Sequence, residues 1–151
     1  MKVTRRDAIR TTGALGTLVS LGLLTAEQAA AAESRPEFAS KTLSGALEAI
    51  GGKPVESDKI AVIAPDIAEN GAVVPVATES KIPGTTDVWF LVENNPQPLA
   101  AHFGFPSGTA PEVKTRVKMG KTSDIIVVAK ADGKLYMAKK ETKVTLGGCG
   151  G

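Results

Sequence analysis

A single thiol stands within a run of glycines near the end of the sequence. Cys149 is the only cysteine, and it is flanked by Gly147, Gly148, Gly150 and Gly151. Glycine has no side chain to bury and loses more conformational freedom on ordering than any other residue, so little would hold this segment against a core. We therefore predict that residues 147–151 form a flexible arm that could bring the thiol of Cys149 into a narrow cleft on another protein.

The residues near Cys149 do little to activate its thiol. Lys143 is the nearest basic residue in the sequence, and with an ordinary thiol pKa of about 8.5 only a few per cent of the thiol would be ionised near neutral pH. A catalytic nucleophile also needs rigid surroundings that position it, which a glycine-rich arm does not provide. We expect a carrier whose thiol is activated by the proteins that receive it, and not an enzyme.

The rest of the sequence offers no second set of residues for catalysis or metal binding. His102 is the only histidine, so a cluster of histidine and cysteine ligands for a transition metal is not expected. Residues 119–123 (Met-Gly-Lys-Thr-Ser) imitate the end of a phosphate-binding loop, but Thr115 occupies the position of that motif's first glycine. We expect no catalytic residue, metal or cofactor, and we expect His102 to be a strand residue with a satisfied hydrogen bond.

Residues 1–32 have the features of an export signal. Arg5 and Arg6 precede an uncharged stretch from residue 11 to residue 26, and small residues suited to a signal peptidase follow. The uncharged stretch is shorter than the ~20 apolar residues that span a bilayer. Because paired arginines favour the twin-arginine route, which exports folded proteins, we predict a periplasmic protein that starts near Glu33 and has no membrane anchor.

The charge of the predicted mature chain is balanced. Residues 1–32 hold four of the 18 basic residues and two of the 16 acidic ones, which leaves 14 of each. Such a chain shows no sign of binding nucleic acid or a membrane surface through its charge. A lone cysteine also cannot form an internal disulfide in an oxidising compartment, so Cys149 is either buried or available to another molecule.

Residues 33–146 are enough for one domain with a single hydrophobic core. Apolar residues at three- and four-residue spacing from Phe38 to Ile50, followed by two glycines, predict an early helix. Short apolar runs separated by turn residues then favour an all-β fold, an antiparallel β-sandwich. The runs lie at residues 59–64, 72–78, 88–93, 99–105, 112–119, 124–130, 134–140 and 142–146.

Local signals add detail to this sandwich. Asp132-Gly133 predicts a two-residue hairpin turn, and Pro75 predicts that its strand has an edge position or a bulge. The unbroken apolar runs at residues 88–92 and 125–129 fit either the core or an interface with another protein.

The run at residues 112–119 alternates between apolar and basic residues. Its valines and methionine are expected to face the core, while Lys114, Arg116 and Lys118 form an outward basic row. This row fits a solvated face or a sheet edge guarded by lysine. It also fits a docking surface for an acidic partner or an oxyanion.

Several stretches of the sequence resemble the SoxY family, the sulfur-carrier subunits of the thiosulfate-oxidising Sox system. Besides the leader and the Gly-Gly-Cys-Gly-Gly motif, the similar stretches cover residues 64–76, 92–103, 115–125 and 131–151. The resemblance implies an immunoglobulin-like β-sandwich that forms a heterodimer with SoxZ, a second small β-protein without a leader. It also implies that Cys149 carries covalent sulfur intermediates.

The resemblance further implies transient docking to the enzymes of the system. SoxAX, a c-type cytochrome, joins thiosulfate to the thiol, and SoxB, a manganese-dependent hydrolase, releases sulfate. SoxCD, in systems that have it, oxidises the remaining sulfur. An arm that brings one attached substrate to each enzyme raises the effective concentration of that substrate.

Three alternatives stay open. A ubiquitin-like carrier would hold sulfur as a thiocarboxylate on its terminal glycine, which would leave the leader and Cys149 unexplained. An interaction module would use Cys149 for intermolecular disulfides, which form readily in an oxidising compartment. A thiol-dependent enzyme would need a base near its nucleophile, and the sequence places none nearby.

Overall fold

The computed structural model describes residues 35–145. The chain divides into two compact units, residues 1–35 and residues 36–151, and every element described below belongs to the second unit. A short 3-10 helix, η1 (Pro36–Ala39), and the helix α3 (Leu43–Ile50) come first. The strands that follow are β1 (Val55–Glu56), β2 (Ile60–Ile63), β3 (Ile67–Ala68), β4 (Val74–Ser80), β5 (Thr85–Val92), β6 (Leu99–Gly104), β7 (Glu112–Val117), β8 (Ser123–Ala131) and β9 (Lys134–Val144).

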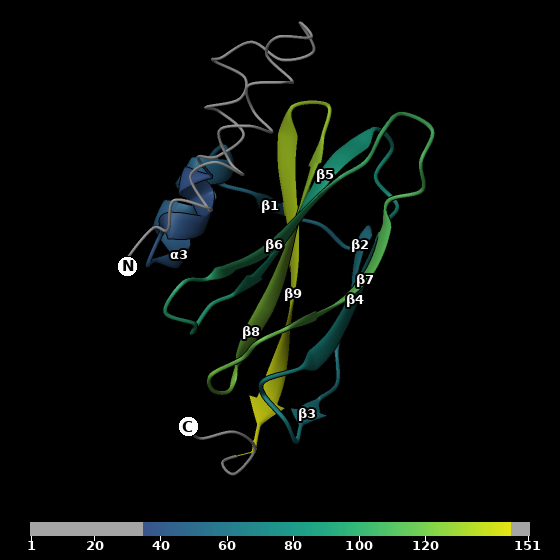
Figure 1. Ribbon diagram of the computed structural model, residues 1–151. Coiled ribbons are helices and arrows are strands. Elements are labelled where there is room, and N and C mark those ends of the chain that lie inside the picture. Colours follow the sequence, from purple (N-terminus) through teal and green to yellow (C-terminus); the bar gives the residue numbers. More distant parts are fainter. Residues whose placement is uncertain (1–34, 146–151) are drawn as a thin grey trace, which may run out of the picture. The chain divides into compact units, whose positions relative to one another are not determined.

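The strands form two sheets (Figure 1). The larger sheet has the order β1-β9-β8-β5-β6, with β3 also paired to β9, and the smaller sheet has the order β2-β4-β7. The predicted β-sandwich with a short N-terminal helix is confirmed. It is not wholly antiparallel, because β1 and β3 pair with β9 in the parallel direction. The alternation pattern did not indicate these two-residue strands, which are too short to show a period.

The central strands of the larger sheet are buried on both faces. On β8, Ile125 and Val127 belong to a core between the two sheets, whereas Ile126 and Val128 belong to a second core that includes Ala46 of α3. Figure 1 shows α3 on the side of the larger sheet that faces away from the smaller sheet. The unbroken apolar runs of the sequence are therefore core strands, because each face of the sheet is covered.

Capping residues set the bounds of the helix. Thr42 has an extended backbone (φ −129°, ψ 148°), and its side chain accepts a hydrogen bond from the N–H of Gly45 at 3.1 Å. This N-cap starts α3 at Leu43 and separates it from η1. Gly51, with φ of 128°, ends the helix in a conformation that other residues rarely adopt. The prediction of one helix from Phe38 onward is therefore wrong at its start.

The predicted hairpin at Asp132-Gly133 is confirmed. These two residues connect β8 to β9, since Ala131 pairs directly with Lys134. Their φ values of 49° and 75° are both left-handed, as a type I′ turn requires. From Lys134, β9 continues without a break to Val144, so the two runs predicted at residues 134–140 and 142–146 form one strand.

Pro75 lies at a point where its strand has an edge, as predicted, although the strand as a whole is not an edge strand. β4 is the middle strand of the smaller sheet, but β2 pairs only with residues 77–80 of β4, whereas β7 pairs with β4 from Val74 onward. At Pro75 the strand thus has a neighbour on one side only. This is a local edge, the position at which a strand tolerates proline.

Candidate functional site

The predicted arm lies outside the described residues. This applies to the thiol of Cys149 and to the four glycines Gly147, Gly148, Gly150 and Gly151. The structure does describe the place from which the arm departs, where β9 ends at Val144 and Thr145 follows. We call Val144 and Thr145 the arm root.

A segment that contains β3 fastens one side of the arm root. The N–H of Thr145 donates to the carbonyl of Ala68 at 3.2 Å, and the N–H of Lys143 donates to the carbonyl of Asp66 at 2.9 Å. The hydroxyl of Thr142, a fully buried residue, donates to the carbonyl of Pro65 at 2.9 Å. The end of β9 is thus held to a segment that lies 77 positions earlier in the sequence.

The loop between β7 and β8 fastens the other side. The N–H of Val144 donates to Oγ1 of Thr122 at 3.0 Å. Two turn residues brace this loop, since Nδ2 of Asn94 donates to the carbonyl of Thr122 at 3.0 Å and Nδ2 of Asn95 donates to the carbonyl of Lys118 at 2.7 Å. The local sequence does not show which distant carbonyls these two asparagine side chains reach. The arm root is therefore held from both sides.

The outer strand of the smaller sheet, β7, carries the predicted basic row. Basic side chains on an edge strand hinder pairing with a strand of another chain. The predicted alternation is confirmed, and the edge position, one of the interpretations left open, is the one that the sheet order shows. Exposed residues of this run are Lys114, Arg116 and Lys118, and buried ones are Val113, Val117 and Met119.

A groove of about 610 Å³ lies on the outer face of the smaller sheet. Its apolar lining includes Pro75, Ala77 and Ile63, and Ile63 is 59% exposed. Lys114 and Arg116 also line the groove. The groove therefore combines an exposed apolar surface with positive charge.

Charge is distributed unevenly along this face. Pairing of β4 with β7 sets Pro75 opposite Arg116, Ala77 opposite Lys114 and Glu79 opposite Glu112, in that order along the strands. Lys114 forms an ion pair with Glu112 at 3.2 Å. Within residues 35–145, Arg116 and Lys118 take part in no ion pair. Along the β4–β7 pair, the positive charge without an ion-pair partner is therefore at one end, and Glu79 and Glu112 are at the other.

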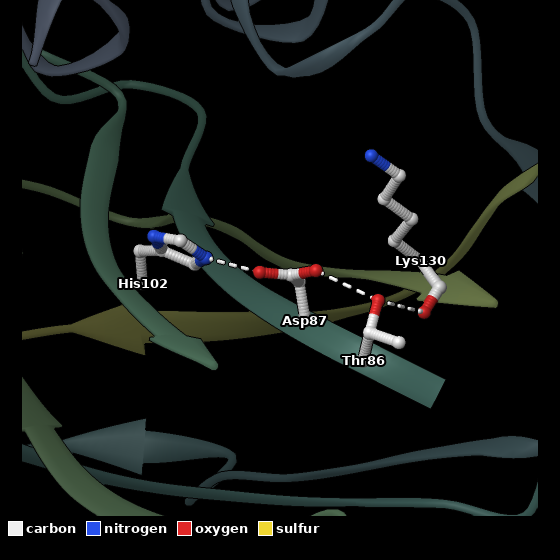
Figure 2. A network of polar contacts seen from close by, with 4 residues as sticks. All are labelled: Thr86, Asp87, His102 and Lys130. Carbon is white, nitrogen blue, oxygen red and sulfur yellow. Dashed lines mark hydrogen bonds and ion pairs between the residues drawn. The ribbon is translucent and has the colours of Figure 1, made fainter. Parts of the chain in front are cut away.

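Figure 2 shows the surroundings of the single histidine. Nε2 of His102 lies 2.8 Å from Oδ1 of Asp87, whose other oxygen accepts a hydrogen bond from the hydroxyl of Thr86 at 2.7 Å. The His102 ring also stacks on Trp89, with 4.7 Å between ring centroids. The expectation for His102 is confirmed, because it is a residue of β6 with a hydrogen-bonded and stacked ring. These contacts hold the ring of His102 in place between two neighbouring strands.

Two further expectations concern metals and membranes. Among residues 35–145, no group of three or more His, Cys, Asp and Glu side chains is placed to hold a metal ion. None of the helices in this part of the chain is long and apolar enough to cross a bilayer. The predicted signal at residues 1–32 lies outside the described residues.

Two comparisons with known proteins identify the family of this chain. A family model, sulfur oxidation protein SoxY, matches residues 47–149. The solved structure of the sulfur carrier protein SoxY from Chlorobium limicola f thiosulfatophilum is 44% identical to this chain, with a TM-score of 0.63. That similarity covers 72% of this chain and 99% of the other. A comparison with curated proteins finds no significant match.

A third similarity is much weaker. The human F-spondin reeler domain is 10% identical, with a TM-score of 0.40, and the match covers 60% of this chain and 93% of that one. At this level it carries no argument about function. The family model and the Chlorobium structure agree with each other and with the two-sheet fold. This chain belongs to the SoxY family of sulfur carrier proteins in sulfur oxidation.

Proposed function

We propose that this protein carries sulfur intermediates as covalent adducts of Cys149 in the periplasm and presents them to the enzymes of a Sox system. The main support is the family match, which runs from residue 47 to residue 149 and so includes the cysteine. The fastened arm root adds support. Cys149 follows Thr145 by four residues, so the segment that bears the thiol starts from a fixed point on the domain.

The chemistry of such a carrier needs enzymes from outside. Joining the Cys149 thiol to thiosulfate forms a sulfur–sulfur bond, releases one proton and passes two electrons to a haem protein of the SoxAX type. Hydrolysis by a SoxB-type enzyme then consumes water, releases sulfate and leaves a persulfide on Cys149. The carrier supplies attachment and reach, while the base that activates the thiol belongs to the receiving enzyme. We propose no catalytic residue, metal or cofactor on the carrier itself.

The proposal includes the organisation of the chain and its partners. Residues 1–32 serve as a twin-arginine signal, residues 33–146 form the β-sandwich domain, and residues 147–151 form the arm. Export in the folded state would allow SoxZ to cross the membrane as a heterodimer with this chain. The arm then docks transiently to SoxAX, to SoxB and, where present, to SoxCD.

Mass spectrometry of the intact protein, isolated from the periplasm of cells that oxidise thiosulfate, tests the proposal. We expect reducible adducts of sulfur or thiosulfate that disappear completely in Cys149→Ser, because the attachment point is gone. The same masses locate the signal cleavage site. Since the substitution lies beyond the described sandwich, the circular dichroism spectrum should stay unchanged.

A relocated thiol provides the matched control. Ser107 is exposed in the loop between β6 and β7, so Ser107→Cys combined with Cys149→Ser keeps one accessible thiol but removes it from the arm. We expect no enzymatic loading of this variant. Adducts on residue 107 would contradict the role of the arm. A modification of Gly151 in the native protein would favour a thiocarboxylate carrier, and disulfide dimers as the sole product would favour an interaction module.

A further inference from the structure

The basic row of β7 begins beside the arm root. Gly71 lies next to both the basic row and the arm root. Its carbonyl accepts a hydrogen bond from the N–H of Met119 at 2.7 Å. A Cβ built on Gly71 would lie 3.0 Å from Cγ1 of Val144. Lys118 is the residue next to Met119. Arg116 lies two positions before Lys118 in the chain, about 7 Å away in an extended strand. Two cations thus lie close to the point where the arm departs.

The arm is long enough to return to these cations. Cys149 follows Thr145 by four residues, which corresponds to about 13 Å at full extension. Lysine and arginine side chains add several ångströms of their own reach from the strand. An adduct on Cys149 can therefore meet Lys118 and Arg116 without any change in the sheet.

The charge of a loaded arm is complementary to this end of the face. An S-thiosulfonate on Cys149 ends in a sulfonate, a group with three oxygens and a negative charge. The forked guanidinium of arginine suits such oxyanions, and its hydrogen bonds to them are stronger than those between neutral groups. Glu79 and Glu112 lie at the opposite end of the β4–β7 pair. Asp66, which is next to the groove residue Pro65, is paired with Lys140 at 3.0 Å. The unpaired cations Arg116 and Lys118 therefore favour an anion at their end of these strands.

The groove beside Arg116 has room for the apolar part of the arm. Ala64 and Pro65, which line the groove, are hydrogen-bonded to β9. Nζ of Lys140 donates to the carbonyl of Ala64 at 2.6 Å, and the hydroxyl of Thr142 donates to the carbonyl of Pro65. The groove therefore extends toward the strand that leads into the arm. Leu146, the first residue of the chain beyond the arm root, supplies an apolar side chain that suits this lining.

We infer that the anionic, loaded arm docks onto the outer face of the smaller sheet of its own domain. The sulfonate on Cys149 binds Arg116 and Lys118, and Leu146 enters the groove beside them. This inference rests on the proposed function, because it requires an anionic adduct on Cys149. Docking holds the sulfonate adduct near the domain between visits to enzymes. An arm that carries a neutral thiol has no negative charge for Arg116 and Lys118 to bind, so it does not dock in this way.

Chemical loading of the purified protein tests the inference without any enzyme. The Cys149 thiolate attacks a central sulfur of tetrathionate, which forms the S-thiosulfonate and releases thiosulfate. Methyl methanethiosulfonate reacts with the same thiolate, releases methanesulfinate and leaves a neutral methyl disulfide. Intact mass verifies each adduct before use. The two loaded proteins differ at Cys149 chiefly in the presence of the sulfonate.

Amide chemical shifts of the labelled protein then report docking. We expect the S-thiosulfonate to shift the amides of residues 114–118, Ile63 and Ala64 relative to the methyl disulfide form. These shifts should disappear in the double variant Arg116→Gln with Lys118→Gln. They should also weaken strongly in about 1 M salt, where the Debye length is only about 3 Å. The control pair Lys53→Gln with Lys134→Gln removes the same charge from two exposed positions away from this face and should keep the shifts.

Each other outcome overturns the inference. Equal shifts for both adducts would show that the sulfonate is not recognised, and shifts that survive in the double variant would exclude Arg116 and Lys118 as its ligands. Shifts that grow with protein concentration would assign the groove to a second copy of the chain. If the adduct forms but no shift appears, docking is disproved while the carrier function stands, because that function is tested by the adducts of the periplasmic protein.

Discussion

Lys139 of β9 and Asp124 of β8 form an ion pair between two adjacent strands of the larger sheet, with 3.0 Å between Nζ and Oδ2. The hydrogen bond that Lys139 donates to Asp124, and then the negative charge of Asp124, raise the pKa of Lys139 above its ordinary value. Because the folded-state pKa exceeds the unfolded one, the protonated lysine favours the folded state. This contribution is fully present below the unfolded pKa and is lost as the pH rises through the folded-state pKa.

Replacement of Asp124 by asparagine should therefore act in a pH-dependent way. Asp124→Asn is expected to lower the pKa of Lys139 and to lower the free energy of unfolding slightly at neutral pH, since exposed pairs contribute little. The difference from the native protein should shrink once the pH exceeds the pKa of Lys139. Urea unfolding at pH 7 and above pH 11, with an NMR titration of Lys139, measures both effects. Glu141→Gln, a neighbouring change in charge, should leave the pKa of Lys139 in place; a shift of similar size there would contradict the assignment to Asp124.

Single residues with a distinctive chemical type could be interpreted from the sequence. His102 was expected to have a satisfied hydrogen bond, and it does. Its partner could not be predicted, because Asp87 lies 15 positions away on a neighbouring strand. Cys149 stays a prediction, supported by its glycine neighbours and by the family match.

At the scale of elements, the strand end that leads into the arm depends on a close approach of three backbone segments. A Cβ on Gly71 would overlap the carbonyl oxygen of Met119 and would crowd Val144. Only glycine allows the loop before β4 to pass this close to the arm root. The restriction is one of space, since the crowding atom belongs to the backbone and cannot rotate away.

Gly71→Ala should therefore destabilise the fold by about 1–3 kcal/mol, the usual cost of overpacking. It should also increase amide hydrogen exchange at Val144 and Thr145, because the contacts that hold the arm root would loosen. Urea unfolding and exchange measured by NMR report these effects. Gly120→Ala is the matched control, since its Cβ would meet only Oδ1 of Asn95 at an ordinary 3.9 Å. Equal effects of the two substitutions would show that the close approach at Gly71 does not matter.

For the molecule as a whole, stability depends on a sheet that is covered on both faces. Val127 and Val128 are neighbours on β8 and are both fully buried, yet they belong to different cores. The core that contains Val128 is completed by α3, an element about 80 positions earlier in the sequence. The short helix is thus a structural cover for the larger sheet.

Val128→Ala should lower the free energy of unfolding by about 2 kcal/mol, a loss similar to that of Val127→Ala. The physical reason is the same for both, since each removes buried methyl groups from a packed core. Val55→Ala, the same substitution at a residue that is 64% exposed, should change stability by less than about 0.5 kcal/mol. If Val128→Ala behaved like Val55→Ala in urea unfolding, the second core would not contribute to stability.

The sequence by itself determined the features that depend on local chemistry. The left-handed turn at Asp132-Gly133, the strand alternation of residues 112–119 and the glycines around the only thiol each follow from the conformations that these residues allow. Only the tertiary structure decided which segments meet. The parallel pairing of β3 with β9, the covering of the larger sheet by α3 and the position of the basic row beside the arm root join residues far apart in the chain. Contacts of this kind depend on packing and backbone pairing between distant segments, for which a local pattern holds no information.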